Sequence, residues 1–291
     1  YQASGLAGGA PRPATLVLDG GNFVGSLNFL AHSRLEVTRQ YAALNASMSG
    51  TLDELVLANG AALNLSSSSL SIARVSNAGA LSLGGGRNFT VTSQFDNNGI
   101  FTLNGSGSTG TAALYVNGAT TLGGAGSTVL TNADYSYIGG SAALTVASGH
   151  TLRGAGYVAT SLVNKGSVIA DGVLTVNAGS NNSFDNTAGT VQVADGARLA
   201  LSSGTFSGGT LQGLGANSRL SGNGSFQSVA LAGDLLLTGS TTLRDVTNTG
   251  NLRLSGVASV NLRGNLANNG SFTVQGSGTT GSASVYVTAA T

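Results

Sequence analysis

The sequence predicts an all-β fold, a right-handed parallel β-helix (β-solenoid) with about 20 residues in each coil. Three observations lead to this prediction: a recurring Asn-x-Gly motif, short stretches of alternating apolar and polar residues, and many small turn-forming residues. The closest pairs of the motif, Asn77 with Asn97 and Asn248 with Asn268, each define a period of about 20 residues. Because equivalent strands of a β-solenoid stack on one another, a repeat of this length is typical of one coil.

The composition favours a folded chain that is rich in β structure. The chain has 291 residues, of which 46 are glycine, and hydrophobic residues make up 41%. Charged residues make up only 8%, yet no run of about 18 continuous apolar residues predicts a membrane-spanning helix. The regular alternation of apolar and polar residues argues against disorder. Short strands joined by tight turns are therefore the predicted elements.

Charge and cysteine content narrow the possible functions. The formal net charge is +1, and the 12 lysine and arginine residues are spread along the chain. Recognition of nucleic acid needs a clustered basic face, so we expect no nucleic-acid partner. The chain has no cysteine, which removes disulfides, zinc-thiolate sites and thiol catalysis together.

The alternating segments predict the strands in chain order. Residues 80–83 and 100–103 each follow an Asn-x-Gly motif, and residues 173–176 form a further strand between turn residues. Their inward side chains would be Leu, Val, Ile and Ala, and their outward side chains Ser, Thr, Asn and Gln. Glycine and asparagine tolerate the left-handed backbone of tight turns, which would explain their abundance. Stacked asparagines would also form a hydrogen-bonded ladder.

The predicted structural turn positions share an Asn-x-Gly or Asn-Gly pattern. They are Asn77, Gly79, Asn98, Gly99, Asn164, Gly166, Asn248, Gly250, Asn269 and Gly270.

A second repeat is much longer than one coil. Residues 97–116 read NNGIFTLNGSGSTGTAALYV, and residues 268–287 read NNGSFTVQGSGTTGSASVYV, identical at 13 of 20 positions. Residues 16–35 also resemble residues 199–220. We therefore expect one continuous β-solenoid over residues 1–291, with a first copy at about 16–198 and a partial second copy at about 199–291.

An antiparallel sandwich or barrel is the alternative fold, because it also contains many short strands. Its strands are joined by hairpins, which give no reason for the sequence to recur at a constant period. The repeat therefore favours the solenoid.

The sequence predicts no catalytic, cofactor-binding or metal site. His32 and His150 are far apart in the chain, and both are expected to be turn residues rather than ligands. Asp53 and Glu54 are adjacent, which in a strand would place them on opposite faces.

Three further aspartates carry the alternative enzymatic hypothesis. Asp171, Asp185 and Asp195 lie in one region, and the interval from Asp171 to Asp195 is slightly longer than one period of the repeat. This pair would stack on neighbouring coils if one coil were slightly long, as the acid pair of a polysaccharide hydrolase would. Isolated aspartates at turns are the other interpretation.

Three tyrosines form one candidate ligand-contact surface. Tyr135 and Tyr137 are two residues apart, so in a strand they would face the same way and present two phenols to a sugar ring. Tyr157 would lie about one coil away and extend this surface. A pair of inward tyrosines without a binding role is the alternative.

The segment 38–55 is a second candidate surface, because the second copy has no counterpart of it. It contains Arg39 and Tyr41 together with Asp53 and Glu54. An insertion in a solenoid usually bulges from one face, where binding sites are often built. A longer coil without a function is equally consistent with the sequence.

Residues 145–176, TVASGHTLRGAGYVATSLVNKGSVIADGVLTV, and the recurring Asn-x-Gly-x-Leu-x-Leu pattern resemble secreted bacterial β-helix exoproteins. These are the filamentous-haemagglutinin-type adhesins of two-partner secretion, with autotransporter passenger segments a close second. The resemblance implies an extracellular β-helical stalk at a bacterial cell surface and an outer-membrane secretion partner.

The functional hypothesis is a structural and adhesive segment of a secreted or surface-anchored exoprotein, without enzymatic activity or a cofactor. It would mediate attachment, aggregation or biofilm formation. Its expected partners are surface glycans or receptors, and further copies or continuations of the same rod. The alternative is a β-helical polysaccharide-degrading enzyme or a tailspike-like depolymerase.

Overall fold

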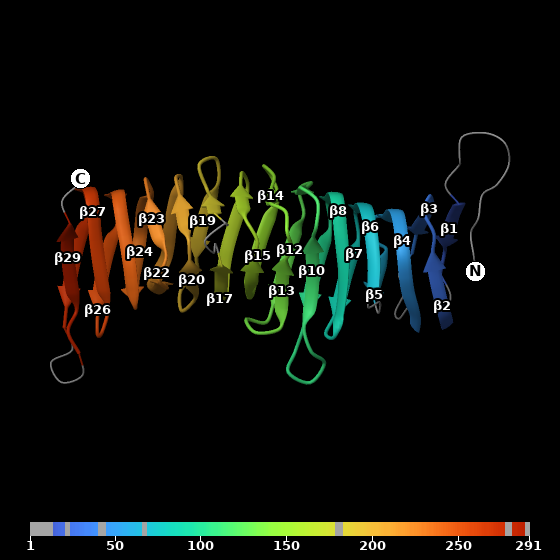
Figure 1. The fold of residues 1–291 in the computed structure, drawn as a ribbon, viewed down its shortest axis with the longest axis horizontal. Coiled ribbons are helices and arrows are strands. Elements are labelled where there is room, and N and C mark those ends of the chain that lie inside the picture. Colours follow the sequence, from blue (N-terminus) through green and yellow to red (C-terminus); the bar gives the residue numbers. More distant parts are fainter. Residues whose placement is uncertain are drawn as a thin grey trace. The chain divides into compact units, whose positions relative to one another are not determined.

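A computed structural model describes residues 14–20, 24–39, 45–65, 69–177, 183–276 and 281–288. These residues form a parallel β-solenoid of about 12 coils, with coils about 20 residues apart (Figure 1). No helix in the described part is long and apolar enough to cross a membrane. The predicted all-β parallel solenoid and its period are confirmed.

The chain divides into two compact units, Tyr1–Leu152 and Arg153–Thr291. The boundary between these units does not coincide with the boundary between the two predicted sequence copies.

The first unit contains strands β1 to β14. They are β1 (Ala14–Leu18), β2 (Val24–Phe29), β3 (Ser33–Val37), β4 (Asn45–Leu57), β5 (Ala62–Leu65), β6 (Ser69–Asn77), β7 (Ala80–Gly84), β8 (Arg87–Asn97), β9 (Ile100–Asn104), β10 (Ala112–Val116), β11 (Thr120–Gly123), β12 (Ser127–Thr131), β13 (Ser136–Gly139) and β14 (Leu144–Val146).

These strands form three parallel sheets, and from β4 onward each coil passes through all three. Sheet I joins β1, β3, the second halves of β4, β6 and β8, and then β11 and β14. Sheet II joins β2, the first halves of β4, β6 and β8, and then β10 and β13. Sheet III joins β5, β7, β9 and β12.

The second unit contains strands β15 to β29. They are β15 (Thr151–Ala159, which belongs to this unit from Arg153), β16 (Leu162–Asn164), β17 (Ser167–Asn177), β18 (Ser183–Asp185), β19 (Thr190–Val193), β20 (Arg198–Ser203), β21 (Thr205–Ser207), β22 (Thr210–Ser221), β23 (Ser225–Gln227), β24 (Ala230–Thr238), β25 (Ser240–Asn248), β26 (Asn251–Ser255), β27 (Ser259–Asn268), β28 (Ser271–Gln275) and β29 (Ser284–Thr288).

Three parallel sheets also run through the second unit. Sheet IV joins the second half of β17, β20, the second halves of β22 and β24, and then β26 and β28. Sheet V joins the first half of β17, β19, the first halves of β22 and β24, and the second halves of β25 and β27. Sheet VI joins β16, β18, β21, β23, the first halves of β25 and β27, and β29.

The core of the first unit contains three phenylalanines from a single coil. Phe89 extends inward from sheet II, Phe95 from sheet I and Phe101 from sheet III. Their ring centroids are 5.0 to 6.4 Å apart, and all three side chains are fully buried. Rings at this separation stabilise a core beyond the area that they bury.

The core of the second unit contains phenylalanines stacked along one sheet. Phe184, Phe206 and Phe226 are strand partners on three successive coils of sheet VI. Their successive centroids are 4.5 and 5.4 Å apart. Like side chains therefore stack on like along this column.

Asparagine ladders link neighbouring coils, as predicted. Nδ2 of Asn77 donates to Oδ1 of Asn97 over 2.7 Å. Asn164 and Asn186 form the same bond over 2.7 Å, and a further pair, Asn248 and Asn268, forms it over 2.6 Å. Asn77, Asn164 and Asn248 also accept from the backbone N–H of the glycine two residues later. Each such asparagine thus closes its own tight turn and bonds the next coil.

The motif glycines are required for a reason that differs from the expected one. Gly79 and Gly99 do not have positive φ, although other turn glycines such as Gly124 do. A Cβ at Gly79 would overlap the carbonyl oxygen of Ala61, and one at Gly99 would overlap that of Gly79. Close approach of neighbouring coils, rather than a left-handed backbone, therefore explains these glycines.

Most predicted turn positions lie in bends, whereas Asn77, Asn164 and Asn248 are the last residues of β6, β16 and β25. In two of the motifs, the asparagine of the ladder comes one residue before the predicted turn position. Asn98 and Gly99 form a bend, and so do Asn269 and Gly270. The buried ladder side chain in the first of these motifs is Asn97, whereas Asn98 is exposed and accepts from the N–H of Ala125.

Candidate functional site

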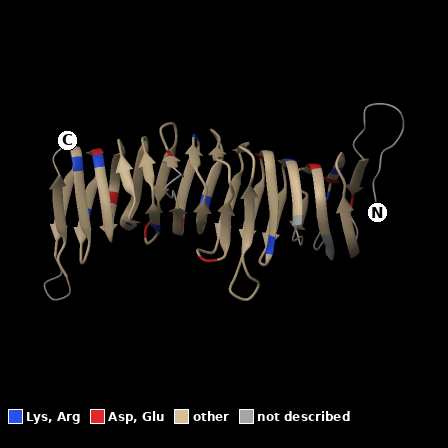
Figure 2. Cartoon of the chain, viewed as in Figure 1, with Lys and Arg blue, Asp and Glu red and all other residues tan. Residues whose placement is uncertain are grey.

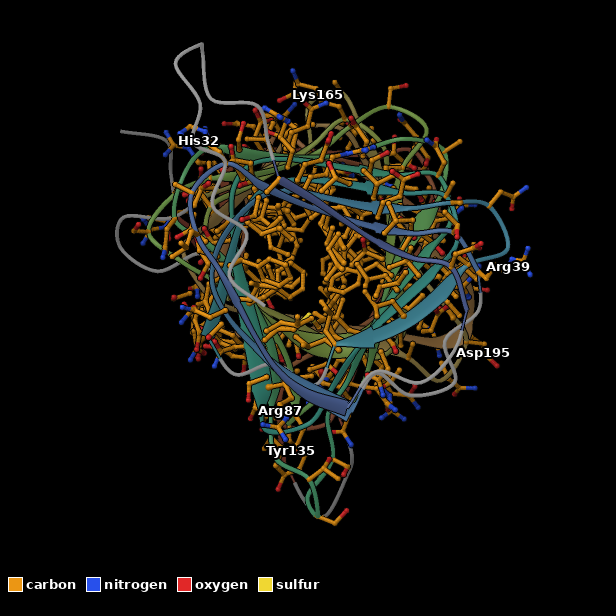
Figure 3. All side chains as sticks on the ribbon, turned by 90° about the vertical axis from the view of Figure 1, so that its right-hand side faces the viewer. His32, Arg39, Arg87, Tyr135, Lys165 and Asp195 are labelled. Carbon is orange, nitrogen blue, oxygen red and sulfur yellow. The ribbon has the colours of Figure 1, made fainter. Side chains whose placement is uncertain are left out.

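Tyr135 and Tyr137 are both half-exposed but contact different neighbours. Tyr135 lies in the tight turn before β13, and its ring faces Gly107 of the loop between β9 and β10 (Figure 3). Tyr137 lies within β13, and its ring covers Gly139, where a Cβ would overlap it. The binding role predicted for these rings stays a prediction.

An aromatic pair that the sequence analysis missed lies on the outer side of sheet II. The rings of Tyr115 in β10 and Tyr137 in β13 are 5.9 Å apart and tilted by 57°. The signal was present, because Tyr115 is retained as Tyr286 in the second copy.

Tyr157 in the second unit takes part in a polar chain. Its hydroxyl accepts from Nδ2 of Asn177 over 2.8 Å, and Oδ1 of Asn177 accepts from the hydroxyl of Ser203 over 2.7 Å. These three residues therefore tie neighbouring coils together on the outer surface.

The predicted surface of the segment 38–55 is described only in part. Arg39 is exposed, and its Nε lies 2.9 Å from the carboxylate of Asp19 (Figure 3). Tyr41 lies outside the described residues.

Asp53 and Glu54 do not lie on opposite faces, so this expectation was wrong. Leu52 and Leu55 on either side of them are both fully buried. The backbone of β4 therefore bends between sheets II and I, and both acids point outward.

Each of the two acids contacts a residue of the preceding coil. Nε of Arg34 donates to Glu54 over 2.8 Å. The backbone N–H of His32 donates to Asp53 over 3.2 Å, and the imidazole of His32 lies 3.4 Å from the same carboxylate. His32 has a φ of 67° in a tight turn, as expected for a turn residue.

His150 follows a tight turn, but its imidazole lies in the core. Nε2 is 3.0 Å from the hydroxyl of Thr128, and both side chains are fully buried. Nδ1 has no hydrogen-bond partner of good geometry among the described residues. Burial lowers the pKa of His150 below its ordinary value of 6.5, and backbone carbonyls of Gly123, Asn97 and Gly124 only partly offset this.

The acid pair of the enzymatic hypothesis contacts different coils. Asp171 forms an ion pair with Arg153 over 2.8 Å, whereas Asp195 accepts from the backbone N–H of Asn217 over 2.8 Å. The carboxylate of Asp171 thus contacts the preceding coil, whereas that of Asp195 contacts the following coil. Among the described residues, no group of three or more His, Asp or Glu side chains is placed to hold a metal ion.

Asp185 is a turn aspartate. It accepts hydrogen bonds from the hydroxyl and the backbone N–H of Thr187, which hold the pKa of its carboxyl below the ordinary value of 3.8. This arrangement stabilises the tight turn after β18.

Charged residues are sparse along the described chain (Figure 2). One column of them in sheet I alternates in sign. Arg34, Glu54 and Arg74 are strand partners on three successive coils. Arg34 also contacts Glu36 on its own strand over 2.8 Å. The carboxylates therefore neutralise this column within the unit.

A column in sheet IV carries arginines without an intervening acid. Arg198 and Arg219 are strand partners, Arg219 is followed by Leu236, and Leu236 by Arg253. This column was not predicted from the sequence. Its signal is a recurring Arg-Leu pair, in which the arginine points outward and the leucine is buried.

The fold and surface define a parallel β-solenoid protein whose outer face is built from columns of stacked side chains. A scan of known protein families finds no matching model, and searches of curated proteins and of solved structures find no significant match.

Proposed function

We propose that this chain is a structural and adhesive segment of a secreted or surface-anchored bacterial exoprotein. The observation that carries the proposal is the repeated construction of the solenoid. Residues 97–104 and 268–275 begin with the same asparagine motif and continue into β9 and β28, which occupy equivalent places after it. A solenoid built in this way is lengthened by repeating coils, as a stalk requires.

The outer surface supports an adhesive rather than a catalytic role. The aspartates considered as catalytic groups contact arginine and backbone N–H groups of neighbouring coils. Hydrolysis of a glycosidic bond typically uses two carboxyl groups that flank one scissile bond. Broad polar sheet faces with a few aromatic and arginine side chains suit contact with an extended partner.

The localisation and partners belong to the same proposal. An extracellular or cell-surface location, an outer-membrane secretion partner and self-association all follow from the resemblance to secreted β-helix adhesins. A chain without cysteine forms no disulfides that would hinder passage through a pore in an unfolded state. The solenoid can then fold coil by coil outside, because each coil needs only its neighbour as a template.

Beads coated with the purified chain test the adhesive role. We expect the beads to be retained on bacterial or host-cell surfaces, or on immobilised polysaccharides, more than beads coated with the urea-unfolded chain. The same chain is incubated with bacterial and plant polysaccharides, and reducing ends are measured. Failure of retention on every surface would overturn the proposal, and release of reducing ends would support the depolymerase instead.

A further inference from the structure

The outer face of sheet IV presents like charges in register on neighbouring coils. Arg198 and Arg219 are direct strand partners, and the guanidinium of Arg253 extends from a coil further along the same column. The residue after each column position is buried, so the column side chains point outward. These buried residues are Leu199, Leu220, Leu237 and Leu254.

The arginines of this column have no carboxylate partner within the described residues. Neither Arg198 nor Arg219 forms an ion pair there, and both are exposed. Arg253 donates from Nη2 to the carbonyl oxygen of Ala216, three residues before Arg219. Its guanidinium therefore reaches back toward the coil that carries Arg219.

Two acids border the column, and both are bound to asparagines. Asp195 accepts from the backbone N–H of Asn217, and Asp234 accepts from Nδ2 of Asn251 over 2.8 Å. Like charges on directly opposite residues destabilise a sheet, and neighbouring strands are only about 4.8 Å apart. An anion from outside the chain would relieve this repulsion.

We propose that the arginine column (Arg198, Arg219 and Arg253) binds a linear polysaccharide that carries anionic groups, carboxylate or sulfate, on its sugars. The inference rests on the proposed adhesive function and names the ligand class. Guanidinium groups bind carboxylates and sulfates in a bidentate manner. One sugar unit is about as long as one strand spacing, so anionic groups on neighbouring sugars meet Arg198 and Arg219, and a further group meets Arg253 one coil beyond Leu236.

Leu236 adds an apolar contact surface to the arginine column. It lies in register between Arg219 and Arg253 and is half-exposed. An aliphatic side chain between two guanidinium groups offers an apolar surface to the C–H face of a sugar ring. The column thus combines charge recognition by three arginines with one apolar contact.

A nucleic acid fits this surface less well. The column has no aromatic side chain, whereas proteins that bind single strands stack bases on aromatic rings. Residues 198–291 carry five arginines and two aspartates, and duplex binding depends on more phosphate contacts than three arginines supply. Single-stranded DNA is therefore a competing ligand in the test.

The test measures binding of the 291-residue chain to dextran sulfate, polygalacturonate, neutral dextran and single-stranded DNA at about 50 and about 200 mM salt. The two anionic polysaccharides distinguish sulfate from carboxylate recognition. The variants are R198Q/R219Q, L236E, and the control R87Q/K165Q, which removes two exposed positive charges elsewhere.

We expect wild type to bind at least one anionic polysaccharide and not neutral dextran. R198Q/R219Q should bind about 10- to 100-fold more weakly, with a salt dependence lower by about two ions. L236E places a carboxylate between two arginines and should weaken binding about 10-fold while the chain stays folded by circular dichroism. The control should change affinity less than about threefold.

The inference is overturned if wild type binds neither anionic polysaccharide, if the control loses as much affinity as R198Q/R219Q, or if DNA binds more tightly than both polysaccharides. Bead retention is measured in parallel for the wild-type chain and for R198Q/R219Q. This measurement distinguishes failure of the arginine column from failure of the proposed adhesive function. Retained beads without anionic-polysaccharide binding would refute only the column, whereas absence of retention would refute the adhesive role.

Discussion

Two outward columns, one in each unit, differ at one central side chain. In sheet I, Arg34, Glu54 and Arg74 follow one another on successive coils, and the glutamate lies between the arginines. In sheet IV two arginines flank Leu236 in the same register. The first column is neutralised within the chain, whereas the second leaves its positive charge available to a ligand.

The difference shows what in-register stacking does to each kind of side chain. Inside the solenoid, stacking like on like is favourable, because Phe184, Phe206 and Phe226 bury their rings against one another. Amide side chains also stack well, since each has a donor and an acceptor. Charged side chains of like sign repel one another in the same geometry. A column of like charges therefore either lowers the stability of the sheet or binds a partner of opposite charge.

The inward columns provide the largest expected effect. Phe206 lies between two other phenylalanines and is fully buried. Phe206→Ala should lower the free energy of unfolding by about 4 kcal/mol, since it leaves a cavity that the stacked coils cannot close. Phe272→Ala, at a half-exposed position of β28, should cost about 1 to 2 kcal/mol. Urea unfolding followed by circular dichroism measures both, and equal losses would contradict the packing described.

The asparagine ladder should give the next largest effect. Asn97→Ala removes the acceptor of Asn77 and a donor to the carbonyl of Ser127, so it should cost about 2 kcal/mol. Asn98→Ala is the neighbouring control, and it should cost less than about 1 kcal/mol because Asn98 is exposed. Urea midpoints of the two variants decide the order, and a greater cost at Asn98 would refute the ladder.

Replacing the central glutamate of the sheet I column with leucine should give that column the side-chain arrangement of the sheet IV column. Glu54→Leu leaves Arg34 and Arg74 on either side of an aliphatic residue, in the arrangement of Arg219 and Arg253. We expect a stability loss of about 1 kcal/mol and a several-fold gain in affinity for dextran sulfate at low salt. Unchanged affinity would show that column charge alone does not determine binding.

The smallest effect at neutral pH concerns His150. Burial lowers its pKa in the folded chain below 6.5, so the unfolded chain binds the proton more readily. The stability from the neutral imidazole is complete above pH 6.5 and should fall as the pH drops from there toward the folded pKa. Asp185, whose pKa is lowered below 3.8, loses its contribution only in a more acidic range.

Unfolding midpoints between about pH 7.5 and about pH 5 measure this dependence. His150→Gln should flatten the decline, whatever its effect on the absolute stability. An unchanged slope in His150→Gln would contradict the buried neutral imidazole.

The period and the alternation were sufficient to predict the fold, because both follow directly from stacked strands with one buried face. Asn77 and Asn97, one period apart, predicted strand partners and a ladder that the structure contains. The function of the glycine in the motif was not predictable from its conformational freedom. Only the packed coils show that Gly79 is required for close approach.

Features at bends between sheets and in coils of unequal length escaped prediction. Asp53 and Glu54 break the alternation because the strand turns a corner between them. The interval along the chain from Arg198 to Arg219 is longer than that from Arg219 to Leu236, so a fixed period does not align these partners. Tight turns of variable length set the register of sheet IV. The arginine column could therefore be identified only from the structure.

Cysteine cross-linking tests the central claim, parallel in-register stacking, most directly, because the chain has no cysteine of its own. Ala80 and Ile100 are exposed strand partners, whereas Asn104 lies four residues further along β9. A disulfide requires Cα atoms within about 7 Å. We predict that A80C/I100C oxidises to an intramolecular disulfide and that A80C/N104C does not. Cross-linking of A80C/N104C with none in A80C/I100C would show antiparallel strands and contradict the solenoid.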